Sequence, residues 1–489
     1  MRRRPMHCNS RRAPAFSLAI SAALVALVGC KRRAPEPQPS ASASAAPAPV
    51  AAAPRCVEAH PGKSFTLGER SNDGADAGDD EDDGLDQPAL PFAVELGRAL
   101  PVGDGFAVSA LSTVGGKTRA VVALLDAEVG AGKVVELGTL HGDPDPPELA
   151  GFESELVALV HDTDAGGELL KLAAVRPGPD KPSVVLGAEI AESRDESRVA
   201  GLELGPERGV AIWDEWSLAD KHGVIVTASF ARKDLSNVTK KRIVSLPSED
   251  AEAPRISRRP GGFWAAWISR SAGPKAKAAA PKAAAPKAAA PKALPSASAS
   301  AEAPEPALVE LGERWVSAVP LDANGVAISE PKPITPKNAH VLVFDLATGP
   351  DGTLLFSWRN DDSAPGTEER QIHLGSVKPD GTVERHLLDD AGPGVGVPAI
   401  LVDDAPKDPA AAQTWLSLAS VSDATRLGAL GPSGTLLDSL AAEPVVRSGE
   451  LIALARGRML LARPRGMAME LGLVECKPGP APLKDAGAD

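Results

Sequence analysis

Three stretches of this chain repeat one motif, a polar turn that closes on a glycine and leads into an apolar residue. They are Leu321-Asp322-Ala323-Asn324-Gly325-Val326, Lys378-Pro379-Asp380-Gly381-Thr382-Val383 and Gly431-Pro432-Ser433-Gly434-Thr435-Leu436. Glycine tolerates the positive φ that such hairpin turns require. Since the three glycines recur at intervals of 56 and 53 residues, we expect each stretch to join two antiparallel strands of a repeated unit.

An apolar segment recurs along with the turns. Its seven copies span residues 106–111, 156–160, 210–213, 263–267, 354–358, 415–418 and 459–462. They begin 44 to 61 residues apart, except for one interval of 91 that contains an Ala/Pro/Lys-rich run of 36 residues, 272–307. Because the segments are almost continuously apolar, we expect strands that are buried on both faces.

This repeat predicts the fold. A period of about 40–50 residues with several strands per unit is typical of propeller blades. With the Ala/Pro/Lys-rich run set aside, the body divides into seven units of about 55 residues. We therefore predict an all-β protein with a β-propeller of seven four-stranded blades, with six or eight as alternatives. Segments 64–68 and 91–97 are expected to complete the last blade.

The N-terminal segment gives the clearest indication of where in the cell the protein is located. A basic segment, 1–12, precedes an apolar segment, 13–28, that ends in Leu27-Val28-Gly29-Cys30. This order resembles the signal and lipobox of bacterial lipoproteins. The resemblance implies cleavage before Cys30, lipidation of Cys30 and anchoring in the cell envelope, and Lys31 after the cysteine implies the outer membrane. The alternative is a plain signal peptide or an uncleaved anchor with a chance cysteine.

Composition sets the remaining boundaries. We expect a signal peptide at 1–29, a lipidated Pro/Ala/Ser-rich tether at 30–54, the propeller at 55–478 and a disordered tail at 479–489. Within the propeller we expect an acidic loop at 71–88 and a disordered insertion at 271–308. Tether and insertion contain too little apolar surface to fold, and regular prolines prevent a stable helix in the insertion.

The cysteines of the body predict a disulfide. Cys56 and Cys476 are the two cysteines of the body and lie at its two ends. In an exported protein they predict one disulfide, with two free buried thiols as the alternative.

The formal charge is −13, and removal of the five leader arginines makes it −18. So acidic a chain is repelled by nucleic acid. We expect the chain to bind a membrane through the lipid on Cys30. We also expect a second partner, which is either a protein or a polymer of the cell envelope.

One stretch resembles a known repeat. Pro350-Asp351-Gly352-Thr353, followed by an apolar strand and Arg359, is similar to the repeat of TolB-type propellers. The resemblance covers one blade and implies the fold rather than a role. Trp213, Trp267 and Trp358 occupy matching positions of the apolar segments, which predicts core packing rather than a ligand cage.

Candidate sites are few. The acidic run 73–84 fits either a calcium loop or a solvated loop, and its sequence lacks the closing glutamate of an EF-hand. The lysines of 272–307 fit either contact with an anionic polymer or a tolerated insertion. His161 beside Asp162 is expected to be a surface pair. Because no hydrolase, metalloprotease or zinc-ligand motif is present, the sequence predicts no catalytic, cofactor-binding or metal-binding residue.

Two functional classes remain. The first is a non-catalytic envelope lipoprotein whose propeller binds or scaffolds a protein or a polymer. The second is a propeller hydrolase or lyase whose active site assembles from several blades. Carboxylates and histidines around the central channel would favour the enzyme. We expect titratable residues to be dilute in the innermost strands, which favours the binding module.

Overall fold

The computed structural model describes residues 55–60, 62–68, 94–114, 117–141, 144–164, 167–178, 181–193, 200–272, 313–360, 371–388, 395–403, 414–420, 425–437, 449–465 and 467–477. All belong to the second of the two units into which the chain divides, 49–489. Cys30, the tether, the acidic run, the Ala/Pro/Lys-rich run and the tail lie outside these residues. Within the described ranges, no helix is long and apolar enough to cross a membrane.

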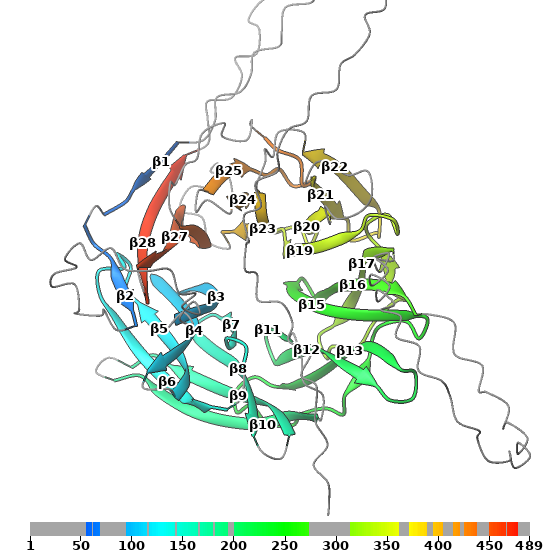
Figure 1. Ribbon diagram of the computed structural model, residues 1–489, viewed down its shortest axis with the longest axis horizontal. Helices are drawn as coiled ribbons and strands as arrows, with labels where there is room; N and C mark the ends of the chain where they lie inside the picture. The colour runs from blue at the N-terminus through cyan, green and yellow to red at the C-terminus, as the bar shows by residue number, and fades with distance from the viewer. Residues whose placement is uncertain are drawn as a thin grey trace, which may run out of the picture. The chain divides into compact units, whose positions relative to one another are not determined.

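The body is a β-propeller of seven four-stranded blades, each an antiparallel sheet (Figure 1). Blade 1 contains β3 (Val94–Val102), β4 (Gly105–Val114), β5 (Lys117–Leu125) and β6 (Gly132–Leu140). Blade 2 contains β7 (Glu148–Phe152), β8 (Glu155–Asp164), β9 (Gly167–Arg176) and β10 (Ser183–Ser193). Blade 3 contains β11 (Ala200–Leu204), β12 (Arg208–Ser217), β13 (His222–Ala231) and β14 (Arg242–Ile243).

The remaining blades repeat this order. Blade 4 contains β15 (Glu249–Arg259), β16 (Gly262–Ser271), β17 (Arg314–Asp322) and β18 (Lys332–Pro333). Blade 5 contains β19 (Val341–Thr348), β20 (Leu354–Asn360), β21 (Ile372–Val377) and β22 (Val383–Leu388). Blade 6 contains β23 (Val395–Val402), β24 (Thr414–Ser420) and β25 (Thr425–Ala429), with a bridge from Leu430 to Leu436 at the fourth position.

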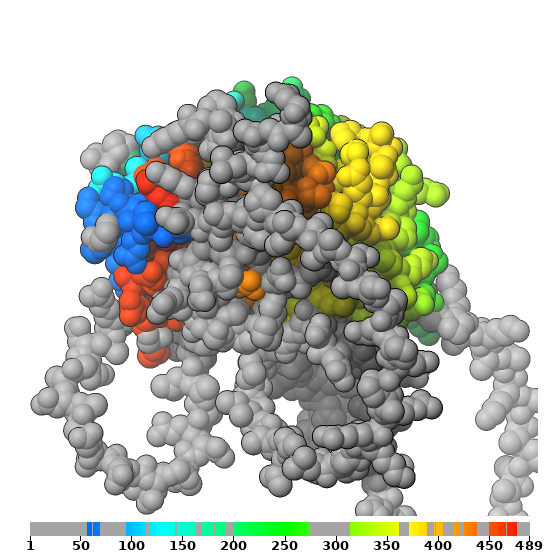
Figure 2. All heavy atoms as spheres, turned by 90° about the horizontal axis from the view of Figure 1, so that it is seen from above, coloured from blue at the N-terminus to red at the C-terminus, as the bar shows by residue number. Residues whose placement is uncertain are grey.

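Blade 7 joins the two ends of the body. Its inner strands are β26 (Glu450–Ala455), β27 (Arg458–Arg465) and β28 (Ala468–Lys477). β1 (Arg55–Glu58) and β2 (Phe65–Leu67) pair with successive parts of β28 and share the outermost position. Figure 2 shows this N-terminal segment, in blue, directly against the C-terminal strand, in red. The innermost strands contact one another in order, and β26 contacts β3, so the ring is closed.

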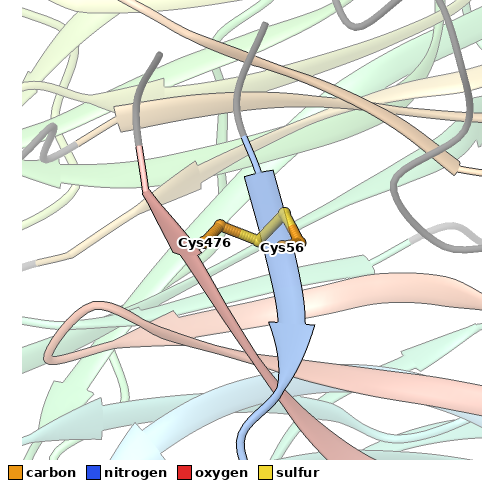
Figure 3. Close-up of a disulfide and its surroundings, with 2 residues drawn as sticks. All are labelled: Cys56 and Cys476. Carbon is orange, nitrogen blue, oxygen red and sulfur yellow. A yellow bond between two sulfur atoms is a disulfide. The ribbon is translucent and has the colours of Figure 1, made fainter. Parts of the chain in front are cut away.

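The predicted disulfide is confirmed at this closure. Cys56 and Cys476 are direct cross-strand partners of β1 and β28, and their sulfur atoms are bonded (Figure 3). Their Cα atoms lie 4.1 Å apart, within the limit of about 7 Å for a bridge without backbone movement. The side chain of Cys476 is buried with Trp415 and Met459 in the core of blades 6 and 7.

One part of the prediction that segments 64–68 and 91–97 complete the last blade is wrong. Residues 64–68 complete blade 7 as expected, but 91–97 do not, because β3 is the innermost strand of blade 1. β3 pairs with β4 through a turn at Gly103 and Asp104. This local hairpin closes a far shorter loop than pairing with the end of the chain would require, and short loops cost less entropy.

The repeated turns form as predicted. In each turn, the residue three positions before the glycine donates its N–H to the carbonyl oxygen of the residue just after the glycine. The glycine N–H donates in turn to the carbonyl oxygen of that first residue. The first distance is 2.8 Å from Asp322 to Val326, 2.9 Å from Lys378 to Thr382 and 2.8 Å from Gly431 to Thr435. The glycines have φ of 72°, 86° and 75°. The Gly349–Thr353 turn has the same pattern, with Gly352 at 84°.

The apolar segments form the second strand of every blade, and their alternate residues pack against the two neighbouring blades. In β16, Phe263, Ala265 and Trp267 contact blade 3, while Trp264, Ala266 and Ile268 contact blade 5. Burial on both faces explains why these segments are almost continuously apolar. Trp213, Trp267 and Trp358 are at most 2% exposed, so their assignment to the core is confirmed. β16 pairs directly with β17, on the two sides of the Ala/Pro/Lys-rich run.

Candidate functional site

The innermost strands of the seven blades surround a central cavity of about 740 Å³. Every one of β3, β7, β11, β15, β19, β23 and β26 contributes residues to its wall. A volume of about 300–1,000 Å³ is typical of small-molecule sites, and the mouths and channels of all-β folds are frequent places for them. This channel is therefore the candidate site.

Charged side chains recur around the channel at similar places in the repeat. Six innermost strands place a charged residue in the wall, 7 to 9 positions before the apolar segment of the same blade: Arg98, Glu148, Glu203, Arg255, Asp345 and Glu450. In blade 6, β23 carries no charged residue. The expectation of dilute titratable residues in the innermost strands is therefore wrong. The reason is that these charges lie in six separate strands, which converge only in the closed ring.

Arg98 and Glu203 form an ion pair between blades 1 and 3. The guanidinium of Arg98 contacts the Glu203 carboxylate and also donates a hydrogen bond of 2.8 Å to the carbonyl oxygen of Leu202. The Glu203 side chain is 11% exposed. Burial lowers the pKa of Arg98, but Glu203 and then Glu148 outweigh it, and the pKa lies above its ordinary value. The charges of this pair are mutually satisfied.

Glu148 and Asp345 are partly buried carboxyl groups in the wall of the channel. Burial raises the pKa of Glu148 above its ordinary value, and Arg98 and Arg255 offset this only in part. Burial likewise raises the pKa of Asp345, against a 2.8 Å hydrogen bond from the backbone N–H of Ile400 and the charge of Arg255. Carboxyl groups with raised pKa values in a cavity are typical of functional sites.

Irregular backbone aims Arg255 into the channel. The β15–β16 register shifts between Glu252 and Arg255, which marks a β-bulge. Ala253 in this bulge has φ of 53°, and its N–H donates to Asp214 Oδ2 at 3.3 Å. A non-glycine residue in this region costs about 1–3 kcal/mol and persists where the surroundings enforce it. Bulges re-aim side chains near functional sites, and β3 shifts register at Arg98 in the same way.

The histidine prediction is corrected. His161 is 8% exposed and lines the channel, so it does not form a surface pair with Asp162. Neighbouring residues of a strand point to opposite faces, and Asp162 faces away. There it contacts His141, with 3.2 Å between His141 Nδ1 and Asp162 Oδ1, and Lys171 at 3.3 Å.

The described residues hold no group of three or more His, Cys, Asp or Glu side chains arranged to bind a metal ion. Cys30, the acidic run and the lysine-rich run lie outside those residues. Among the sequence-predicted site residues, the structure brings together Cys56 and Cys476. The channel residues were missed, and the shared spacing of their charges is the signal that identifies them.

Neither a known protein family nor a curated protein matches the sequence. Solved structures with similar folds include hydrazine synthase of Kuenenia stuttgartiensis, 12% identical, covering 76% of this chain and 94% of that one with a TM-score of 0.45. The polysaccharide lyase Uly1 is 10% identical, covering 86% and 98%, with a TM-score of 0.45. The propeller domain of the Trilobed protease of Pyrococcus furiosus is 9% identical, covering 80% and 98%, with a TM-score of 0.42. Likenesses this distant say nothing about the chemistry of the channel.

Proposed function

We propose that this chain is a lipoprotein of the bacterial cell envelope whose propeller is a binding module, with the central channel as its ligand site. The occupant is a small polar molecule or one unit of an envelope polymer. The proposal rests on one observation: six blades each place a charged residue in the wall of one cavity, 7 to 9 positions before the apolar segment of the same blade.

Stability alone does not account for these charges. Taking a carboxylate out of water costs free energy unless it is fully paired, and apolar residues of similar size are often as stable or more so. Burial outweighs the nearby arginines at both Glu148 and Asp345 and raises their pKa values. A ligand that satisfies these groups would explain why the innermost strands carry them.

The envelope location is supported by the leader and by the disulfide. The stretch Leu27-Val28-Gly29-Cys30 follows a basic and then an apolar segment, and disulfides persist in oxidising compartments outside the cytoplasm. Cys30→Ser is expected to abolish metabolic labelling with fatty acid and to release the protein from the outer-membrane fraction. Persistent labelling of that variant would contradict the anchor.

The channel assignment is tested by filling the channel. Ala399 lines the channel in β23, and Ala131 lies exposed in the turn between β5 and β6. We expect Ala399→Trp to abolish binding of purified peptidoglycan fragments or lipopolysaccharide sugars by the full-length chain, whereas Ala131→Trp leaves it unchanged. Equal binding by the two variants, both with an unchanged β-sheet circular dichroism spectrum, would show that the ligand site lies elsewhere.

A second function is favoured by the raised pKa values of two carboxyl groups in the channel wall, Glu148 and Asp345. Glycoside hydrolysis uses a general acid whose pKa is raised by its surroundings together with a second carboxyl group. Burial raises the pKa of both Glu148 and Asp345. If the chain is a hydrolase or lyase, it will release reducing ends or unsaturated sugars from an envelope polysaccharide. Glu148→Gln would then abolish the activity, and Glu136→Gln on the outer strand β6 would not.

A further inference from the structure

The charged groups of the channel differ in how far the protein already satisfies them. Arg98 is bound to Glu203 and to the carbonyl oxygen of Leu202. Arg258 lies 5.0 Å from the ring centroid of Phe152. Glu95 and Glu450 take part in further interactions of their own. These groups have partners before any ligand enters.

Arg255 is the exception. Its side chain is exposed within the channel, and its hydrogen bond is a long one, 3.5 Å, to the carbonyl oxygen of the adjacent Pro254. Among the residues that the structure describes, no carboxylate oxygen lies within 4.0 Å of the Arg255 guanidinium. Most of its N–H donors are therefore available, and a guanidinium presents them as a planar fork that matches a carboxylate.

Two carboxyl groups accompany this arginine without pairing closely with it. Glu148 and Asp345 lie in the wall of the same cavity, near enough for the charge of Arg255 to lower the pKa of each against the effect of burial. Carboxylate oxygens accept hydrogen bonds from hydroxyl groups. One free guanidinium with two acceptors beside it suits a ligand that has one acid group and several hydroxyls.

We infer that the channel binds an anionic sugar, whose acid group pairs with Arg255 and whose hydroxyls donate to Glu148 and Asp345. This inference rests on the proposed function of the channel and names the class of ligand. The bulge and the positive φ at Ala253 hold Arg255 in the wall before the ligand arrives. Such preorganisation reduces the entropy lost on binding.

The test compares three sugars that share a ring and differ in charge: glucuronate, glucose and glucosamine. Binding to the full-length chain in detergent is measured by isothermal titration calorimetry. We expect glucuronate to bind at least about tenfold more tightly than glucose, the effect of one charge-assisted pair. Arg255→Gln should remove this preference, and Arg255→Lys should restore part of it, because lysine retains the charge and lacks the fork. Arg258→Gln is the matched control and should retain the preference.

The outcomes distinguish failure of the ligand class, an anionic sugar, from failure of the binding function of the channel. Preference for glucose or glucosamine overturns the anionic sugar, and a glucuronate preference that survives Arg255→Gln overturns the pairing of the acid group with Arg255. Both results leave the channel as a binding site. Absence of binding by all three sugars at millimolar concentration overturns the anionic sugar, whereas equal binding of peptidoglycan fragments by Ala399→Trp and Ala131→Trp is the result that overturns the binding function of the channel. Loss of the preference in Arg258→Gln as well as in Arg255→Gln, with both variants folded, contradicts the specific role of Arg255.

Discussion

The second strand and the innermost strand of each blade lie in one sheet, yet they follow opposite rules. The second strands are apolar on both faces, as in β16, where Trp264 and Trp267 pack against different neighbouring blades. The innermost strands carry charged side chains and β-bulges at the edge of the sheet, as in β3 and β15. The propeller therefore separates stability, which resides between the blades, from the candidate site at the axis.

The sequence predicts the first of these regions far better than the second. Gly325, Gly381 and Gly434 mark their turns because their positive φ favours glycine. The apolar segments are visible because burial on both faces removes polar residues over several consecutive positions. The charges at Arg98, Glu148 and Arg255 lie far apart in the sequence, and only the closed ring brings them together. Their spacing was informative, but the convergence follows from the fold.

The largest effect is expected where the ring closes. Replacing both Cys56 and Cys476 by serine removes a cross-link between residues 420 positions apart. In the chain-entropy account this loss is worth about 5 kcal/mol, reduced by any strain in the native bond. We expect a large fall in the denaturant midpoint, matched by reduction of the wild type. An unchanged midpoint would show that strand pairing in blade 7 suffices, and Val57→Ser on the same strand is the control.

Truncation between the blades is expected to rank next. Trp267 is fully buried between blades 3 and 4, and Trp267→Ala should cost about 3–5 kcal/mol through lost contacts and a cavity. Arg255→Gln on the adjacent innermost strand should cost at most about 1 kcal/mol. Chemical denaturation of both variants measures the difference. Similar losses would mean that the two regions are not separated in the way described here.

A smaller effect depends on pH. Burial raises the folded-state pKa of Glu148 above the unfolded value of about 4, so the folded protein binds this proton more tightly. The stability contributed by Glu148 is therefore lost as pH rises from about 4 through the folded pKa. Glu148→Gln should gain melting temperature relative to wild type as pH rises from 4 to 8. Glu136→Gln on β6 should show no such trend, and the same trend in both would disprove the channel origin.

The smallest effect is expected from the Ala/Pro/Lys-rich run. Its flanking strands β16 and β17 pair with each other, with Arg270 opposite Arg314, and a shorter loop changes closure entropy little. Deletion of residues 272–307 should leave the melting temperature within about 3 °C of wild type. Cooperative loss of structure would show that the run belongs to blade 4, contrary to the repeat.

Reactivity of a thiol placed in the channel tests the central claim most directly. Ser257 lines the channel in β15, and Ser329 lies exposed after β17. In a background that carries Cys8→Ser and Cys30→Ser, and with Cys56 and Cys476 bonded to each other, Ser257→Cys provides one free thiol. A negatively charged methanethiosulfonate should label it readily, and glucuronate should slow this labelling without affecting Ser329→Cys. A thiol at position 257 that stays unreactive, or that glucuronate protects no more than the thiol at 329, would contradict a ligand site in the channel.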